Sequence, residues 1–172
     1  MLIRMFFSRP VIFALLLAGS SLTTRPLHAQ AVDTSDNGAF GLAVGLLSGT
    51  GLAYRQNWDN GMGAQLAGFL LDTSNFFTAN IGLNAFYTLH RTKYVRFYIP
   101  AGVSAYRINY AQKPYKDWTS LFVGGGYGMA YGISKQIGVA LELPLNVEIR
   151  MKDRPRYGGI YPIPSLALLY FF

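Results

Sequence analysis

Few residues of this chain have side chains that could carry out nucleophilic, acid–base or metal chemistry. The sequence contains no cysteine, which excludes a thiolate nucleophile, a thiolate metal site and a disulfide framework. Of its two histidines, His28 lies in the N-terminal segment and His90 stands in the stretch "LHRTK". Because nucleophilic catalysis needs a general base within reach and no His/Asp/Glu set has metal-ligand spacing, we expect no catalytic residue, no metal site and no cofactor.

Charged and hydrogen-bonding side chains instead recur at alternate positions within apolar segments. In "IGVALELPLNVEIRM" (137–151) every odd position is apolar, whereas Glu142, Asn146 and Glu148 stand at even positions. A period of two is typical of a β-strand with two unlike faces. The function of these residues therefore depends on which face meets water.

The polar faces of these segments do not resemble a surface in water. In 76–89 the polar face has threonine, asparagine and glycine but no charge, and in 118–133 it is mostly serine, glycine and alanine. A solvated surface carries about a quarter to a third charged residues, but only 13% of this chain is charged. We therefore expect the polar face to fill a barrel and the apolar face to contact lipid.

Eight alternating segments, separated by turn residues, account for the chain after residue 38. They are 39–47, 51–58, 62–71, 76–89, 94–110, 118–133, 136–151 and 160–172. Short connections alternate with long ones, as they do in membrane-spanning barrels. The predicted fold class is all-β, an eight-stranded antiparallel up-and-down transmembrane β-barrel. One kinked strand over 39–58 is the alternative, which would give seven strands.

Four prolines fall inside these predicted strands. Proline cannot donate to a strand ladder and is found at edges, strand starts or bulges. Pro100 and Pro144 therefore predict β-bulges, whereas Pro162 and Pro164 lie near the external end of the last strand, where they are tolerated.

The interior of an eight-stranded barrel is just wide enough for side chains to fill it. We predict a polar plug there, which contains Arg55, Arg96, Glu142 and Glu148. Because a buried charge needs a partner, Glu142 is expected to pair with Arg55 or Arg96. The plug is interpreted as structural, and a gate or proton-linked switch is the alternative.

Aromatic residues stand at one end of the outward-facing stripes. Membrane barrels carry aromatic girdles at both interfaces. The predicted girdle on the periplasmic side consists of Trp58, Tyr87, Phe97, Tyr131, Tyr170 and Phe172.

The first 31 residues have the layout of a secretory signal peptide. Arg4 and Arg9 precede an apolar run (11–18) that is too short to cross a bilayer as a helix, and cleavage is expected after Ala29 or Ala31. We predict a signal peptide over 1–31, a polar lead-in over 32–38 and the barrel over 39–172, with a retained anchor as the alternative. No basic helix interleaved with aromatic residues is present, which disfavours nucleic-acid binding.

The chain ends in "SLALLYFF", with Leu166, Leu168, Tyr170 and Phe172 on one face. This ending resembles the C-terminal motif of bacterial outer-membrane β-barrel proteins. With its eight predicted strands, the chain is similar to the small eight-stranded members of the outer-membrane protein β-barrel superfamily. The resemblance implies a monomer in the bacterial outer membrane, contacts with outer-membrane lipid and lipopolysaccharide, and recognition of Phe172 by the barrel assembly machinery.

Basic residues gather in the two longest connections, where Lys113 and Lys116 lie in one and Lys152, Arg154 and Arg156 in the other. Because arginine makes bidentate contacts with phosphate, the second group is a candidate lipopolysaccharide contact. A solvated loop is the alternative.

The expected function is a structural or surface-interaction role, of the adhesion or defence kind, without catalysis. The strands 94–110 and 118–133 exceed the ~11 residues that a tilted strand needs to cross a bilayer, so a sheet should protrude whose edge could pair with a partner strand. Alternatives are a lipid-A-modifying enzyme, a narrow channel and a secreted lipocalin-like binder of apolar ligands. Lipid-A-modifying barrels need a histidine and a serine near the outer leaflet, whereas His90 is predicted on the periplasmic side and no H-x-S motif is present.

Overall fold

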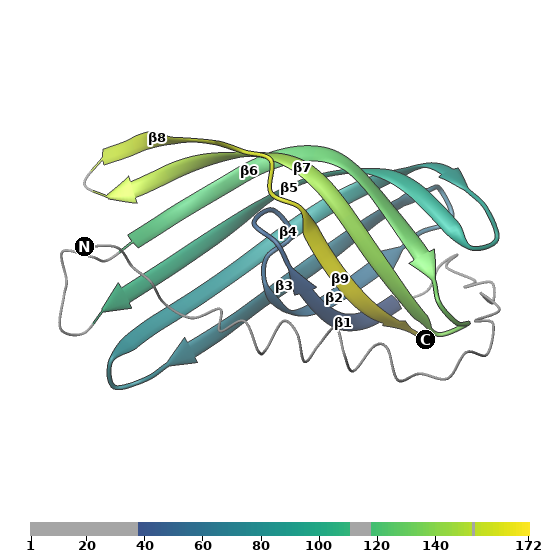
Figure 1. Cartoon of the computed structure of the whole chain (residues 1–172), viewed down its shortest axis with the longest axis horizontal. Helices are drawn as coiled ribbons and strands as arrows, with labels where there is room; N and C mark the ends of the chain where they lie inside the picture. The colour runs from purple at the N-terminus through teal and green to yellow at the C-terminus, as the bar shows by residue number, and fades with distance from the viewer. Residues whose placement is uncertain (1–37, 111–117, 153) are drawn as a thin grey trace, which may run out of the picture.

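The computed structural model describes residues 38–110, 118–152 and 154–172. These residues form nine β-strands in one antiparallel sheet (Figure 1). The strands are β1 (Gly38–Val44), β2 (Gly51–Asn57), β3 (Met62–Asp72), β4 (Phe76–Arg91), β5 (Val95–Tyr110), β6 (Trp118–Gly132), β7 (Ile137–Lys152), β8 (Arg154–Tyr161) and β9 (Ser165–Phe171). Within these ranges, no helix is long and apolar enough to cross a membrane.

The sheet closes into an eight-stranded barrel, because β9 pairs with β1 as well as with β7. One edge of β7 pairs with β6, and the other edge pairs with β8 and β9 in succession, so β8 and β9 together form the eighth strand of the barrel. The predicted eight-stranded antiparallel up-and-down barrel is therefore confirmed. The seven-strand alternative is wrong, since β1 and β2 are separate strands that pair with each other.

Three predicted strand boundaries differ from the structure by more than one residue. β1 ends at Val44 rather than at Leu47, so residues 45–47 belong to the connection with β2. The eighth strand of the barrel begins at Arg154 rather than at Ile160, and it is interrupted over residues 162–164, where two prolines cannot donate to the ladder. The predicted turn "HRTK" begins too early, because β4 continues through Arg91. A register shift between Thr88 and His90 accommodates the extra residue.

The two faces of the sheet are arranged as the alternation predicts. The outward residues Ile81 and Leu143 are 57% and 61% exposed, whereas Asn84 and Glu142 are buried at 0% and 3%. The apolar face therefore forms the exterior of the barrel and the polar face its interior.

The bulges predicted at Pro100 and Pro144 are wrong, because the register runs through both residues without a shift. Each proline instead lies beside a gap in a neighbouring ladder. The β5–β6 pairing is interrupted between Tyr98 and Ala101, and the edge of β7 beside Pro144 faces the break between β8 and β9. A missing backbone donor is tolerated at such gaps.

The strands differ in length, which makes one side of the barrel longer than the other. β1, β2 and β9 have seven residues each, whereas β4, β5 and β7 have sixteen. The β3–β4 and β7–β8 hairpins extend past β1 and β2 at the end of the barrel away from the C-terminus (Figure 1). We call this end the loop end, and we call the end with the C-terminus and the short turns the turn end.

Candidate functional site

The centre of the barrel holds a buried ion pair. Arg55 of β2 and Glu142 of β7 meet with Nη2 3.0 Å from Oε1, and their side chains are 2% and 3% exposed. The hydroxyl of Tyr98, on β5, accepts a hydrogen bond from Arg55 Nη2 (3.2 Å) and donates one to Glu142 Oε1 (2.9 Å). Of the two arginines expected as partners of Glu142, the structure places Arg55 against it and Arg96 elsewhere.

Further residues of the barrel wall hold the Arg55 guanidinium in place. Its Nε donates to Gln65 Oε1 at 2.9 Å, and its plane lies over the ring of Phe86, with 4.6 Å between Cζ and the ring centroid. Asn84 donates to the second oxygen of Glu142 at 3.4 Å. A desolvated charge costs several kcal/mol unless it is paired and hydrogen-bonded, and these contacts supply the pairing. The arrangement is a packed polar cluster.

The connection between β1 and β2 folds into the lumen. In this inner loop (residues 45–50), Leu47 and Ser48 are buried, at 0% and 2% exposure. Hydrogen bonds between the wall and the loop run from Ser104 to the Leu46 carbonyl, from Tyr106 to the Gly45 carbonyl, and from the Thr50 amide to Asn80 Oδ1 (2.8 Å). The Thr50 and Tyr106 hydroxyls are also within hydrogen-bond distance of each other, at 3.4 Å. The inner loop thus fills the lumen on the loop-end side of the ion pair.

Two glycines allow the inner loop to contact the wall through its backbone. Gly49 has a φ of 79°, and a Cβ there would lie 2.9 Å from the amide nitrogen of Gly82 on β4. A Cβ on Gly82 would in turn clash with the backbone of Ser48 and Gly49. The inner loop was not among the features predicted from the sequence. The glycine-rich 45–51 stretch opposite the inward-facing Gly82 is the signal in the sequence that points to it.

A second buried carboxylate lies nearer the loop end. Glu148 is 2% exposed and accepts hydrogen bonds from Ser120 (2.7 Å), Tyr161 (3.2 Å) and Arg150 Nε (3.1 Å). The Arg150 side chain is 53% exposed, so this ion pair reaches the surface. Glu148 therefore ties β6, β7 and β8 together where the sheet leaves the closed barrel.

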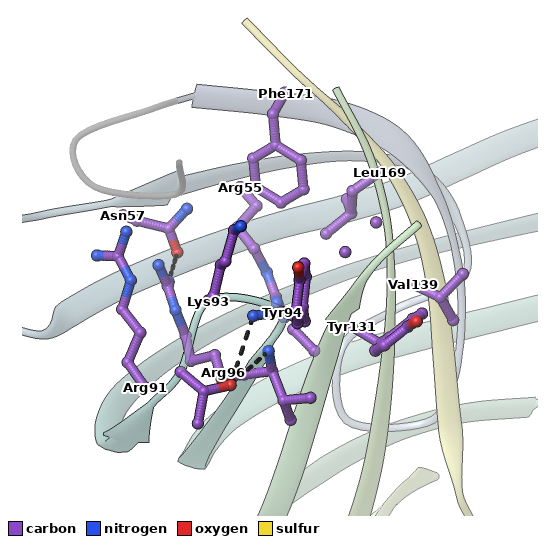
Figure 2. A pocket seen from close by; sticks show the side chains of 15 residues that line it. Arg55, Asn57, Arg91, Lys93, Tyr94, Arg96, Tyr131, Val139, Leu169 and Phe171 are labelled. Atoms are coloured by element: carbon purple, nitrogen blue, oxygen red, sulfur yellow. Dashed lines mark hydrogen bonds between the residues drawn. The ribbon is translucent and has the colours of Figure 1, made fainter. Parts of the chain in front are cut away.

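The mouth of the barrel at the turn end is basic and narrow. Arg91, Lys93 and Arg96 line it beside the ring of Phe171 (Figure 2). Arg96 donates to Asn57 Oδ1, so it closes the mouth and does not reach Glu142. The space between these side chains that water could occupy is about 30 Å³, which holds no more than a few water molecules. The mouth therefore offers no room for an organic ligand.

All six aromatic residues of the predicted girdle project from the barrel exterior and are 41–67% exposed. Strand pairing places them near the turn end, where Tyr131 pairs with Val95 and Tyr170 pairs with Ile137. The side chains of Lys152, Arg154 and Arg156 lie outside the described part of the structure. So do Lys113, Lys116, the predicted signal peptide and residues 32–37 of the lead-in, whereas Gly38 already belongs to β1.

His90 is exposed and lies on β4, where it pairs with Phe97 at the turn end, rather than in the turn itself. It borders a surface hollow together with Trp58, Asp59 and Arg91. Across residues 38–110, 118–152 and 154–172, no group of three or more His, Asp or Glu side chains could hold a metal ion. The contacts that the interior side chains make are ion pairs and hydrogen bonds within the wall.

No family model matches the chain, and no curated protein shows significant sequence similarity to it. Among solved structures, the crystal structure of Neisserial surface protein A (NspA) matches 78% of this chain and 90% of its own, with 17% sequence identity and a TM-score of 0.36. A likeness at this TM-score carries no weight for function. The strand pairing itself shows that this chain is a closed, eight-stranded antiparallel barrel, the architecture of the small outer-membrane barrels that its sequence resembles.

Proposed function

We propose that this chain is an integral β-barrel of a bacterial outer membrane, exported with a cleaved signal peptide, with a structural or surface-interaction role and without catalysis. The inversion of polarity carries the proposal. Leu66, Leu83 and Leu143 are 47–61% exposed on the exterior, whereas Arg55 and Glu142 are buried inside. A continuous apolar exterior of this extent is unfavourable in water and favourable in lipid.

The height of the apolar exterior fits a bilayer. On β5 the outward positions from Phe97 to Ala105 are apolar, and Arg107 follows them. The ten residue steps from Phe97 to Arg107, at ~3.3 Å each and tilted by about 40°, rise ~25 Å, which is the height of the lipid-facing band of membrane barrels.

Electrophoresis of the outer-membrane fraction, with and without boiling, tests the proposal. A folded barrel that resists cold detergent migrates at two positions, one for the unboiled and one for the boiled sample. A single position, or recovery of the protein without detergent, would favour the secreted lipocalin-like alternative. The polar, filled interior argues against that alternative, because it offers no lumen for an apolar ligand.

A channel is disfavoured, because the ion pair and the inner loop fill the lumen. We expect no step conductance in a planar bilayer. Sustained conductance of the wild-type protein would contradict the structural role and support the narrow-channel alternative. A change in the lipid A mass spectrum on expression of the protein would instead support a lipid-A-modifying enzyme.

The proposed partners are outer-membrane lipid, lipopolysaccharide and the barrel assembly machinery, with the barrel as a monomer. Lys152, Arg154 and Arg156 are proposed to contact lipopolysaccharide phosphates, and Phe172 to be read during assembly. Unchanged lipopolysaccharide co-purification after R154Q and R156Q substitution would count against the first contact. For the surface role, the β3–β8 sheet protrudes at the loop end, and β8 pairs only with β7 among the described strands.

A further inference from the structure

A shallow apolar trough of about 750 Å³ crosses the exterior of the barrel near the loop end. Its floor lies where the outward positions are small, at Gly68, Ala79 and Ala105. Small residues there leave the sheet backbone uncovered, which explains why the surface is hollow. Larger side chains stand around these small residues, and they are Leu52, Leu66, Leu70 and Ile81. Of these, Ile81 lies between Gly68 and Ala105.

The trough follows neighbouring register rows across several strands. Gly68 pairs with Ile81, which pairs with Ala105 on β5. At the β1 and β2 end, the rings of Phe40 and Tyr54 close the trough, with 6.4 Å between their centroids. From Phe40 on β1 to Thr119 on β6, five inter-strand steps of ~4.8 Å make it about 24 Å wide across the sheet.

Arg107 is the charged residue among those that line this mostly apolar trough, and Thr119, which also lines it, pairs with Arg107 from β6. The Arg107 backbone pairs with Ala79 on the other neighbouring strand, and its Nε donates to Asn109 Oδ1 at 3.2 Å. Arg107 is exposed and lies ~25 Å above the Phe97 level, by the strand rise and tilt used above. The guanidinium therefore lies at the head-group level, and the small-residue floor reaches below it into the hydrocarbon.

We propose that this trough binds one membrane lipid, with an acyl chain over Ala79 and Ala105 beside Ile81 and a head-group phosphate on Arg107. The proposal rests on the membrane location proposed above. A bilayer lipid has its anionic group at the interface and its hydrocarbon beneath, which matches the order of charge and apolar surface in the trough. Guanidinium groups bind phosphate oxygens in paired hydrogen bonds. The site lies on the barrel wall and is distinct from the basic β7–β8 connection.

Native mass spectrometry of the full-length barrel, purified from membranes, tests the charge contact. The probe is an equimolar mixture of phosphatidic acid and phosphatidylcholine with identical acyl chains. The wild-type barrel should retain phosphatidic acid in excess, and R107Q should lower that excess about fivefold, the upper range for a single exposed ion pair. K135Q removes an exposed cation at the turn end and should leave the excess unchanged.

Filling the trough tests the acyl-chain contact. Ala105→Leu places a large side chain on the floor and should reduce the retention of both lipids, without a change in their ratio. The matched control is Ala101→Leu, two outward positions nearer the turn end on the same strand and outside the trough, which should leave retention unchanged. All these substitutions face outward, and unchanged heat-modifiability confirms that each variant is folded.

Equal retention of the two lipids by the wild-type barrel, or an excess that survives R107Q, overturns the proposal. Equal effects of A105L and A101L also overturn it. Failure of the wild-type barrel to show heat-modifiability would instead contradict the membrane location itself, so the two failures are distinguishable.

Discussion

Removing one charge from the buried ion pair gives the sharpest test of the barrel interior. Glu142→Gln keeps the size of the side chain but removes the charge that faces Arg55 Nη2 at 3.0 Å. Arg55 cannot move into water, because its side chain is 2% exposed and is held by Gln65 and Phe86. The substitution therefore leaves a buried cation without its counter-charge.

The expected magnitude follows from two opposing terms. Two charges 3.0 Å apart attract by about 5 kcal/mol at an effective dielectric constant of 20, and the desolvation of both groups offsets much of this. In E142Q the desolvation of Arg55 remains and the attraction is lost. We expect a fall of about 3 kcal/mol in the free energy of unfolding, the lower end for a broken buried pair, because the amide oxygen still accepts from Tyr98.

Urea unfolding of the barrel in lipid vesicles, followed by the fluorescence of Trp58 and Trp118, measures this loss. The single variants R55M and E142Q and the double variant form a double-mutant cycle, whose coupling energy should be at least about 2 kcal/mol. E148Q is the control, because its partner Arg150 is half exposed and water can replace the lost contact. A coupling energy near zero, or a larger loss for E148Q than for E142Q, would refute the reasoning.

Three further predictions concern the inner loop, the exterior and the C-terminus. Gly82→Leu should displace the inner loop, because even a Cβ at this position clashes with Ser48. The displacement should lower the unfolding free energy by about 2 kcal/mol and raise conductance in a planar bilayer. Ala85→Leu, which faces outward on the same strand, should change neither the unfolding free energy nor the conductance. Leu83→Arg places a charge in the apolar band and should cost ~2–4 kcal/mol in vesicle-folding equilibria, whereas Tyr110→Arg at the loop end should have little effect. Phe172→Ala should slow insertion by the barrel assembly machinery without a change in unfolding free energy, since Phe172 is 67% exposed. Phe171→Ala should instead destabilise the barrel, because Phe171 is buried. Equal insertion rates for F172A and the wild type would contradict the assembly role.

The alternation of the sequence was sufficient to predict the barrel because it acts locally. Along β7 it assigns Leu141 and Leu143 to one face and Glu142 to the other, and this assignment needs no knowledge of the neighbouring strands. The same pattern places Arg55 and Arg96 inside. It does not determine which of them meets Glu142, because that depends on how far each residue lies along its strand.

Register would have decided the partner of Glu142. Tyr98 pairs with Gly128, and Gly128 pairs with Glu142, so the three lie in one row. A Cβ on Gly128 would clash with the Tyr98 ring. Because glycine has no Cβ, the ring can lie over Gly128 on the inner face of the sheet and reach Glu142. Arg96 lies two residues nearer the turn end than Tyr98, so Asn57 at the mouth is its neighbour.

The inner loop follows from the same reasoning when it is applied to a row that lacks large side chains. Ala53, Ala67, Gly82 and Ser104 lie side by side across β2 to β5, and all four face inward. Such a row leaves an empty volume on one side of the lumen, and protein interiors do not keep voids of that size. Some other part of the chain must fill the space, and the nearest is the glycine-rich connection beside it. Rows of small inward residues should therefore predict inserted loops in barrels of this width.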